Sequence, residues 1–179
     1  MNPLERRSWK DAVLDHVLEA CAAHAPLRDT LVFKGARILS LRLGDGLRQS
    51  LDIDSNLEMS FAMAHSRLED QQKYLQREVD AGLRRFLGRQ EPVRYTVERV
   101  HVVMKPAAGR HPLGWTGFKI TVVVRDNTRS RVRGLPSVEI DVASPERLGA
   151  NSTADLDVGD HVVRAYTLER LAGEKMRAS

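Results

Sequence analysis

A short run in which acidic and aliphatic residues alternate constrains this chain more than any other feature. Leu51 and Ile53 alternate with Asp52 and Asp54. Successive side chains of a β-strand point to opposite faces, so the run predicts a strand with both aspartates on one face. Two neighbouring carboxylates repel each other unless a cation lies between them, and Mg²⁺ prefers oxygen ligands from carboxylates and phosphates. The alternative is a pair of solvated aspartates on an edge strand.

A second stretch of the chain repeats this pattern. Between residues 138 and 142, valine and isoleucine alternate with Glu139 and Asp141. If the two predicted strands are neighbours in one sheet, Asp141 joins Asp52 and Asp54 in a cluster of three carboxylates. Such a cluster is typical of a site for divalent metal ions.

A lysine and a glycine stand at the start of a helix predicted over residues 35–43. Gly35 lets an anion approach the free backbone N–H groups at the helix N-terminus, where the helix dipole favours negative charge. Lys34 adds a full positive charge at the same end, which predicts a clamp for an anion. The alternative is a lysine that only extends from a strand end into solvent. The helix is apolar nearly all round, so deep burial is expected.

The remaining periodicities predict the fold class. Apolar residues at helical spacing predict a first helix over residues 3–24 and a long helix over residues 66–88. From residue 93 to 143 the period changes to two, which predicts three strands. Residues 149–160 predict a polar loop that leads to a last, amphipathic helix over residues 167–178. We therefore expect an α/β (α+β) fold in which helices flank a mixed or antiparallel sheet.

Composition excludes several classes of protein. With 28 Lys+Arg against 24 Asp+Glu, the net charge of +4 is modest, so any nucleic-acid signal depends on where the arginines cluster. The single cysteine, Cys21, excludes a disulfide framework and is expected to be a buried thiol in a reducing cytoplasm. No apolar run approaches the ~20 residues of a membrane span, so no membrane partner is expected.

Arginines gather in a predicted hairpin loop over residues 125–133, which holds four arginines and one aspartate. Arginine pairs with phosphate and stacks on bases, so Arg129, Arg131 and Arg133 are candidate RNA ligands. A charged turn that is simply solvated explains the same residues equally well.

Two of these segments together resemble a known family. Lys34-Gly35-Ala36, a short helix and then Arg48-x-Ser50-x-Asp52-Ile53-Asp54 are similar to the AbiEii/AbiGii toxin family of nucleotidyltransferases, in which Lys-Gly-Gly precedes Arg-x-Ser-x-Asp-Leu/Ile-Asp. Residues 169–178 resemble a late Glu-x-x-x-x-Glu-Lys-Leu-Arg-Ala segment of that family. The resemblance implies a nucleotidyltransferase-like domain over residues 1–165. Residues 166–179 would begin a C-terminal helical segment that continues in longer relatives.

The resemblance implies an enzyme that moves a nucleoside monophosphate from an NTP to a hydroxyl acceptor, with tRNA or another RNA as the expected acceptor. Asp52, Asp54 and Asp141 would hold two Mg²⁺ ions, and Asp141 would help to deprotonate the acceptor. The implied nucleotide ligands are Lys34, Gly35, Arg48, Ser50 and Lys175. The implied biological role is that of a toxin with a cognate antitoxin as partner.

Two other functions stay open. Ala36, Arg37 and Glu139 stand where the family has a second glycine, a hydroxyl residue and a lysine. These departures favour a catalytically degenerate module that keeps the fold and binds RNA or a partner protein. An acidic cluster also fits a metal-dependent nuclease.

Overall fold

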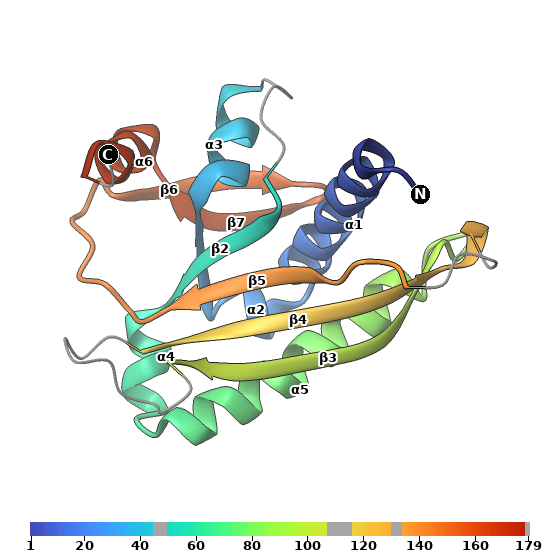
Figure 1. Ribbon diagram of the computed structural model, residues 1–179. Helices are drawn as coiled ribbons and strands as arrows, with labels where there is room; N and C mark the ends of the chain where they lie inside the picture. Colours follow the sequence, from blue (N-terminus) through green and yellow to red (C-terminus); the bar gives the residue numbers. More distant parts are fainter. Residues whose placement is uncertain (45–49, 107–115, 130–133, 178–179) are drawn as a thin grey trace.

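Seven strands form one sheet in the order β3-β4-β5-β2-β1-β7-β6 (Figure 1). The computed structural model describes residues 1–44, 50–106, 116–129 and 134–177, apart from the side chains of Lys175 and Arg177. The strands are β1 (Leu31–Lys34), β2 (Asp52–Leu57), β3 (Tyr95–Lys105), β4 (Gly117–Asp126), β5 (Val138–Ala143), β6 (Thr153–Val158) and β7 (His161–Tyr166). The helices are α1 (Pro3–Ala23), α2 (Ala25–Arg28), α3 (Gly35–Leu43), α4 (Met59–Ala64), α5 (Leu68–Leu87) and α6 (Leu168–Arg177), with a 3₁₀ turn η1 (Asn127–Arg129).

The sheet is mixed, as the sequence predicted. β2 pairs antiparallel with β1 and parallel with β5. β4 lies antiparallel between β5 and β3, while β7 runs parallel to β1 and antiparallel to β6. Strands from both halves of the chain therefore meet at β2, in the middle of the sheet.

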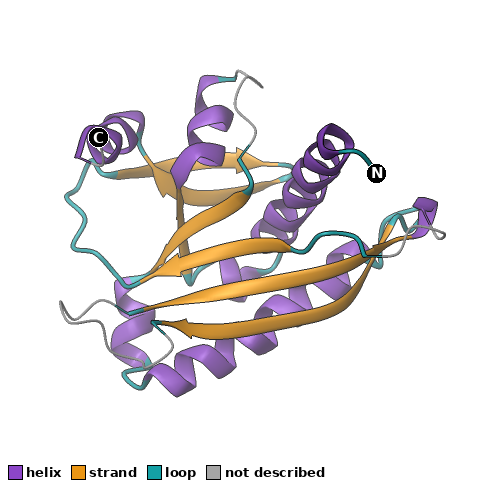
Figure 2. Ribbon diagram, viewed as in Figure 1, coloured by secondary structure: helices purple, strands orange, loops and turns teal. Residues whose placement is uncertain are grey.

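Helices α1 and α5 pack on one face of the sheet. α1 begins with a capping box, in which the side chain of Asn2 accepts from the backbone of Glu5 and the Glu5 side chain accepts in return. It buries Trp9, Val13 and Val17 at helical spacing against the strands. No described helix covers the other face of β3, β4 and β5, which Figure 2 turns toward the viewer. The chemistry-bearing side chains of these strands lie on that open face.

The expected buried thiol is confirmed. Cys21 is fully buried in α1, and its burial raises the pKa of the thiol to about 12. Within the described residues, no helix is long and apolar enough to cross a membrane.

Two expectations about the fold are wrong. Residues 149–160 do not form a simple loop, because β6 lies within them and pairs with β7 to extend the sheet beside β1. Helix α3 is not deeply buried all round: Leu41 and Leu43 are 43% and 54% exposed. The charged Arg37 is buried instead, at 6% exposure.

Candidate active site

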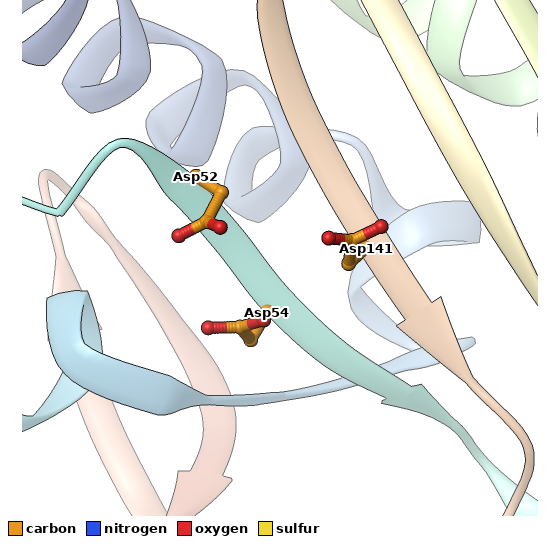
Figure 3. Close-up of side chains that lie close together, drawn as sticks. All are labelled: Asp52, Asp54 and Asp141. Atoms are coloured by element: carbon orange, nitrogen blue, oxygen red, sulfur yellow. The ribbon is translucent and has the colours of Figure 1, made fainter.

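Three carboxylates converge where β2 and β5 lie side by side. The parallel register sets Asp54 directly opposite Asp141, and Asp52 lies two residues away on the same face of β2. Figure 3 shows the three side chains on these neighbouring strands. One oxygen from each carboxylate lies within 4.8 Å of the others, and all three residues are half-buried. The structure thus brings together the three acids that were expected to meet if the two alternating strands were neighbours.

The environment of Asp54 disfavours its negative charge. Burial, together with the charges of Asp52 and Asp141, raises the pKa of Asp54 to about 6, while the ammonium of Lys34 opposes the shift. A site that disfavours its own negative charge gains stability when a cation binds. Glu174 of α6 also raises the pKa of Asp54, so this helix lies within electrostatic range of the acids.

Gly35 packs directly against Asp54. Its φ is 80°, which glycine tolerates and other residues rarely adopt. A Cβ at this position would lie 2.1 Å from Oδ2 of Asp54, so there is also no room for a side chain. The start of α3 and the acidic strand can approach this closely only because residue 35 is glycine.

Ser50 and Arg37 support the acidic strand from its N-terminal side. The Ser50 hydroxyl lies 2.9 Å from both the backbone oxygen and Oδ1 of Asp52, and it can donate a hydrogen bond to either. Arg37 donates to the backbone oxygen of Ser50 at 3.0 Å and pairs with Asp11 and Asp15 of α1. Arg37 therefore joins α1 to the entry of β2, which gives this departure from the family pattern a structural role.

Two lysines that the sequence reasoning missed lie beside the carboxylates. Lys105 Nζ of β3 lies 2.6 Å from Oδ1 of Asp141, and Lys119 Nζ of β4 lies 2.6 Å from Oε1 of Glu139. Its hydrogen bond with Glu139 raises the pKa of Lys119. The sequence did contain a signal for Lys119, because the alternation along its strand places this residue on the outward face. Glu139, the other departure on β5, is thus neutralised by a cation from the next strand.

A cleft of about 760 Å³ opens next to the acids. Its lining comprises Lys34, Lys105, Pro106, Thr116, Gly117, Phe118, Asp141, Val142, Ala143, Ser144, Pro145 and Glu146. This volume lies within the range of ordinary small-molecule sites, roughly 300–1,000 Å³. A nucleotide-sized ligand therefore has room beside Asp141.

A polar network closes the wall of the cleft near Lys34. The hydroxyl of Tyr166 donates to Glu146 at 2.8 Å and accepts from Asn56 at 2.7 Å. Arg170 pairs with Glu146 at 2.7 Å, and the Lys34 ammonium lies 5.7 Å from the centre of the Tyr166 ring. Burial and the charge of Glu146 raise the pKa of Tyr166, which keeps its hydroxyl protonated.

Several residues singled out from the sequence are not placed at the site. Arg48, Arg131 and Arg133 lie outside the described residues, as does the side chain of Lys175. Arg129 lies in η1 beyond the end of β4, where its Nε is 3.9 Å from Oδ2 of Asp126.

Comparison with known proteins identifies a family and finds the same fold in other proteins. The family model described as "Nucleotidyl transferase AbiEii toxin, Type IV TA system" matches residues 16–179. A Helicobacter pylori structure entitled "putative nucleotidyltransferase" has a TM-score of 0.53 at 16% identity, over 91% of this chain and 57% of that one. JHP933 from Helicobacter pylori has a TM-score of 0.54 at 15% identity, over 93% of this chain and 56% of that one. The chain thus spans little more than half the length of these two proteins, and the likeness shows a shared fold. No curated protein matches the sequence.

Proposed function

Because the chain belongs to the family of nucleotidyl transferase AbiEii toxins of type IV toxin–antitoxin systems, we propose that it transfers a nucleoside monophosphate from an NTP to a hydroxyl group of RNA. The observation that supports this most is the convergence of Asp52, Asp54 and Asp141 beside the glycine at the start of α3. The family, that of a toxin–antitoxin system, also supports a cognate antitoxin as partner. We propose tRNA as one acceptor. A cytoplasmic location is part of the same proposal.

The three acids suit hard divalent cations. Their donors are all carboxylate oxygens, and their mutual distances within 4.8 Å allow one ion to be shared. We propose that these residues hold two Mg²⁺ ions. When bound, Mg²⁺ neutralises phosphate oxygens and favours ionisation of the attacking hydroxyl.

The chain's own residues supply placement and charge. The N–H of Gly35 and the ammonium of Lys34 would bind the β- and γ-phosphates, because they form the positive end of α3. Ser50, whose hydroxyl holds Asp52, would be a further polar group near these phosphates. Arg48 and Lys175 remain proposed nucleotide ligands, and Arg129, Arg131 and Arg133 remain proposed RNA contacts.

The bond changes follow from this placement. The acceptor oxygen forms a bond to the α-phosphorus, the bond from that phosphorus to the bridging oxygen breaks, and pyrophosphate leaves. Asp141 would accept the proton of the acceptor hydroxyl. Positioning and charge neutralisation suffice for phosphoryl transfer, so no covalent enzyme intermediate is needed.

The test is label transfer by the full chain. The protein is incubated with total tRNA, Mg²⁺ and each α-³²P-labelled NTP in turn, and we expect Mg²⁺-dependent labelling of RNA. A γ-labelled NTP should leave the RNA unlabelled. D52N and D141N should abolish transfer, whereas E139Q, which removes a neighbouring carboxylate from the same strand, should retain it. RNA binding without transfer would indicate a non-catalytic module, and shortened RNA without NTP would indicate a nuclease.

A further inference from the structure

The open face of β3 and β4 extends away from the acids and is rich in cations. The outward-pointing residues alternate with the buried ones on each strand. The basic residues on this face are Arg99, His101 and Lys105 of β3 and Lys119 and Arg125 of β4. All of them are exposed except Lys119, which is half-buried. No described helix covers this face (Figure 1).

The register orders these cations with respect to the carboxylates. Lys119 lies directly opposite Asp141, and Lys105 pairs with Asp141 through its ammonium. Arg99 and Arg125 lie farther along the same face toward the other end of β4. Arg125 lies six positions after Lys119, which is roughly 20 Å along a strand.

The two distal arginines are not neutralised by acids. Among the described residues, Arg99 has no ion-pair partner, and Arg125 donates one hydrogen bond, of 3.3 Å, to Oδ1 of Asn127. The exposed acid of β3, Glu98, is the extra residue at the register shift between Val97 and Arg99. Asp126 at the end of β4 is buried and accepts a hydrogen bond from Trp9.

The chemistry of the proposed reaction defines the direction from which the acceptor approaches. In-line displacement places the attacking and leaving oxygens on opposite sides of the phosphorus. The leaving pyrophosphate belongs at Lys34 and Gly35, on the β1 side of Asp54. The acceptor therefore approaches from the β5 side, and the sheet order then leads over β4 and β3.

We propose that this open face, from Lys105 and Lys119 to Arg99 and Arg125, binds the phosphate backbone of the single-stranded acceptor end of an RNA. The proposal rests on the proposed nucleotidyl transfer for its direction. Single-stranded nucleic acid is commonly held in a positively charged groove that follows its backbone. Lys105 and Lys119 would contact the phosphates next to the reacting end, and the two arginines those farther away.

The test compares two double variants that lose the same charge. R99Q/R125Q removes the distal cations, while R85Q/R89Q removes two exposed arginines on the helical side of the sheet, one in the last turn of α5 and one just beyond it. RNA affinity is measured by filter binding over a range of salt concentrations. Two lost contacts to a single strand should reduce the slope of log K against log salt by about 1.4, and the control should keep the wild-type slope. Mg²⁺-dependent NTP binding, measured by equilibrium dialysis, should be unchanged in both variants.

The outcomes separate this proposal from the proposed reaction. If the wild type binds RNA but transfers no label, the proposed reaction is wrong. The salt dependence of RNA binding then still tests whether this face binds RNA. The proposed RNA-binding surface is contradicted if R99Q/R125Q keeps the wild-type salt slope. It is also contradicted if both double variants lose the same amount of slope. A wild type that labels protein and does not bind RNA contradicts it as well. Where transfer occurs, R99Q/R125Q should raise the KM for RNA and leave kcat at saturating RNA unchanged.

Discussion

Replacing Asp54 by asparagine removes one of three mutually repelling carboxylates. In the folded chain, burial and the charges of Asp52 and Asp141 raise the pKa of Asp54 from 3.8 to about 6. The folded state therefore binds a proton at Asp54 more tightly than the unfolded state does, and ionisation of this group destabilises the fold. The D54N side chain has nearly the same shape and no charge. In the absence of divalent metal, we expect D54N to be more stable than the wild type at neutral pH.

The magnitude follows from the pKa shift. One unit corresponds to about 1.36 kcal/mol, so the rise from 3.8 to about 6 lowers the free energy of unfolding by about 3 kcal/mol well above pH 6. Below pH 3.8 the carboxyl is protonated in both states and the penalty is absent. At pH 5 the same linkage relation gives a destabilisation of the wild type by about 1.6 kcal/mol. The stability advantage of D54N should therefore grow by about 1.4 kcal/mol between pH 5 and pH 8.

The assay is urea unfolding at pH 5 and pH 8 in the presence of EDTA, followed by circular dichroism and linear extrapolation. Comparing the stability difference between D54N and the wild type at the two pH values cancels any effect of the amide that does not depend on pH. E139Q is the control, since Glu139 pairs with Lys119 and should show no comparable gain. Adding Mg²⁺ should then stabilise the wild type more than D54N, because a ligand stabilises the state that binds it.

Either of two results would refute this reasoning. The first is the same stability difference between D54N and the wild type at pH 5 and pH 8. The second is a D54N variant less stable than the wild type at pH 8 without metal, which would mean that the Asp54 carboxylate makes a net favourable interaction in the fold.

Three further substitutions test the contacts around the site. Gly35→Ala places a methyl group 2.1 Å from the Asp54 carboxylate, and the displacement should lower the initial rate of label transfer by about 10²-fold. A wild-type rate would contradict that geometry. Arg37→Ala leaves its two acidic partners on α1 without a cation, and since one of them is 58% exposed we expect a cost of about 2 kcal/mol in urea unfolding. A change below about 0.5 kcal/mol, the usual range of surface substitutions, would show that the buried guanidinium is dispensable. Tyr166→Phe removes the hydroxyl shared by Asn56 and Glu146 and should cost about 1–3 kcal/mol, visible as a lower Tm. An unchanged Tm would mean that water replaces that hydroxyl.

Alternation along single strands allowed much of the site to be predicted. The period of two in β2 and β5 determines which face Asp52, Asp54 and Asp141 occupy, because side chains of a strand alternate between faces. It does not determine which strands are neighbours. That depends on the sheet order, which brings β5 to β2 although β3 and β4 intervene along the chain. Lys105 escaped prediction because its pairing with Asp141 depends on register across three strands.

The C-terminal strands were missed for a different reason. β6 is an edge strand whose exposed positions include Asp155 and Asp157, so its composition is that of a polar loop. In β7 only Val163, Ala165 and Tyr166 are buried, too short a run to distinguish from a helix start. The burial of α3 was misjudged because the deciding partners of Arg37 lie on α1, more than twenty residues away in sequence.

The parallel pairing of β2 with β5 also determines when, during synthesis of the chain, the cluster of three carboxylates can first form. Asp141 follows Ser55 by 86 residues, so a ribosome adding 5–20 residues per second makes β2 about 4–17 s before β5. During synthesis the two aspartates of β2 therefore have no third carboxylate beside them. A growing chain therefore has no complete set of metal ligands until β5 has been translated, and any transferase activity would begin only after that point.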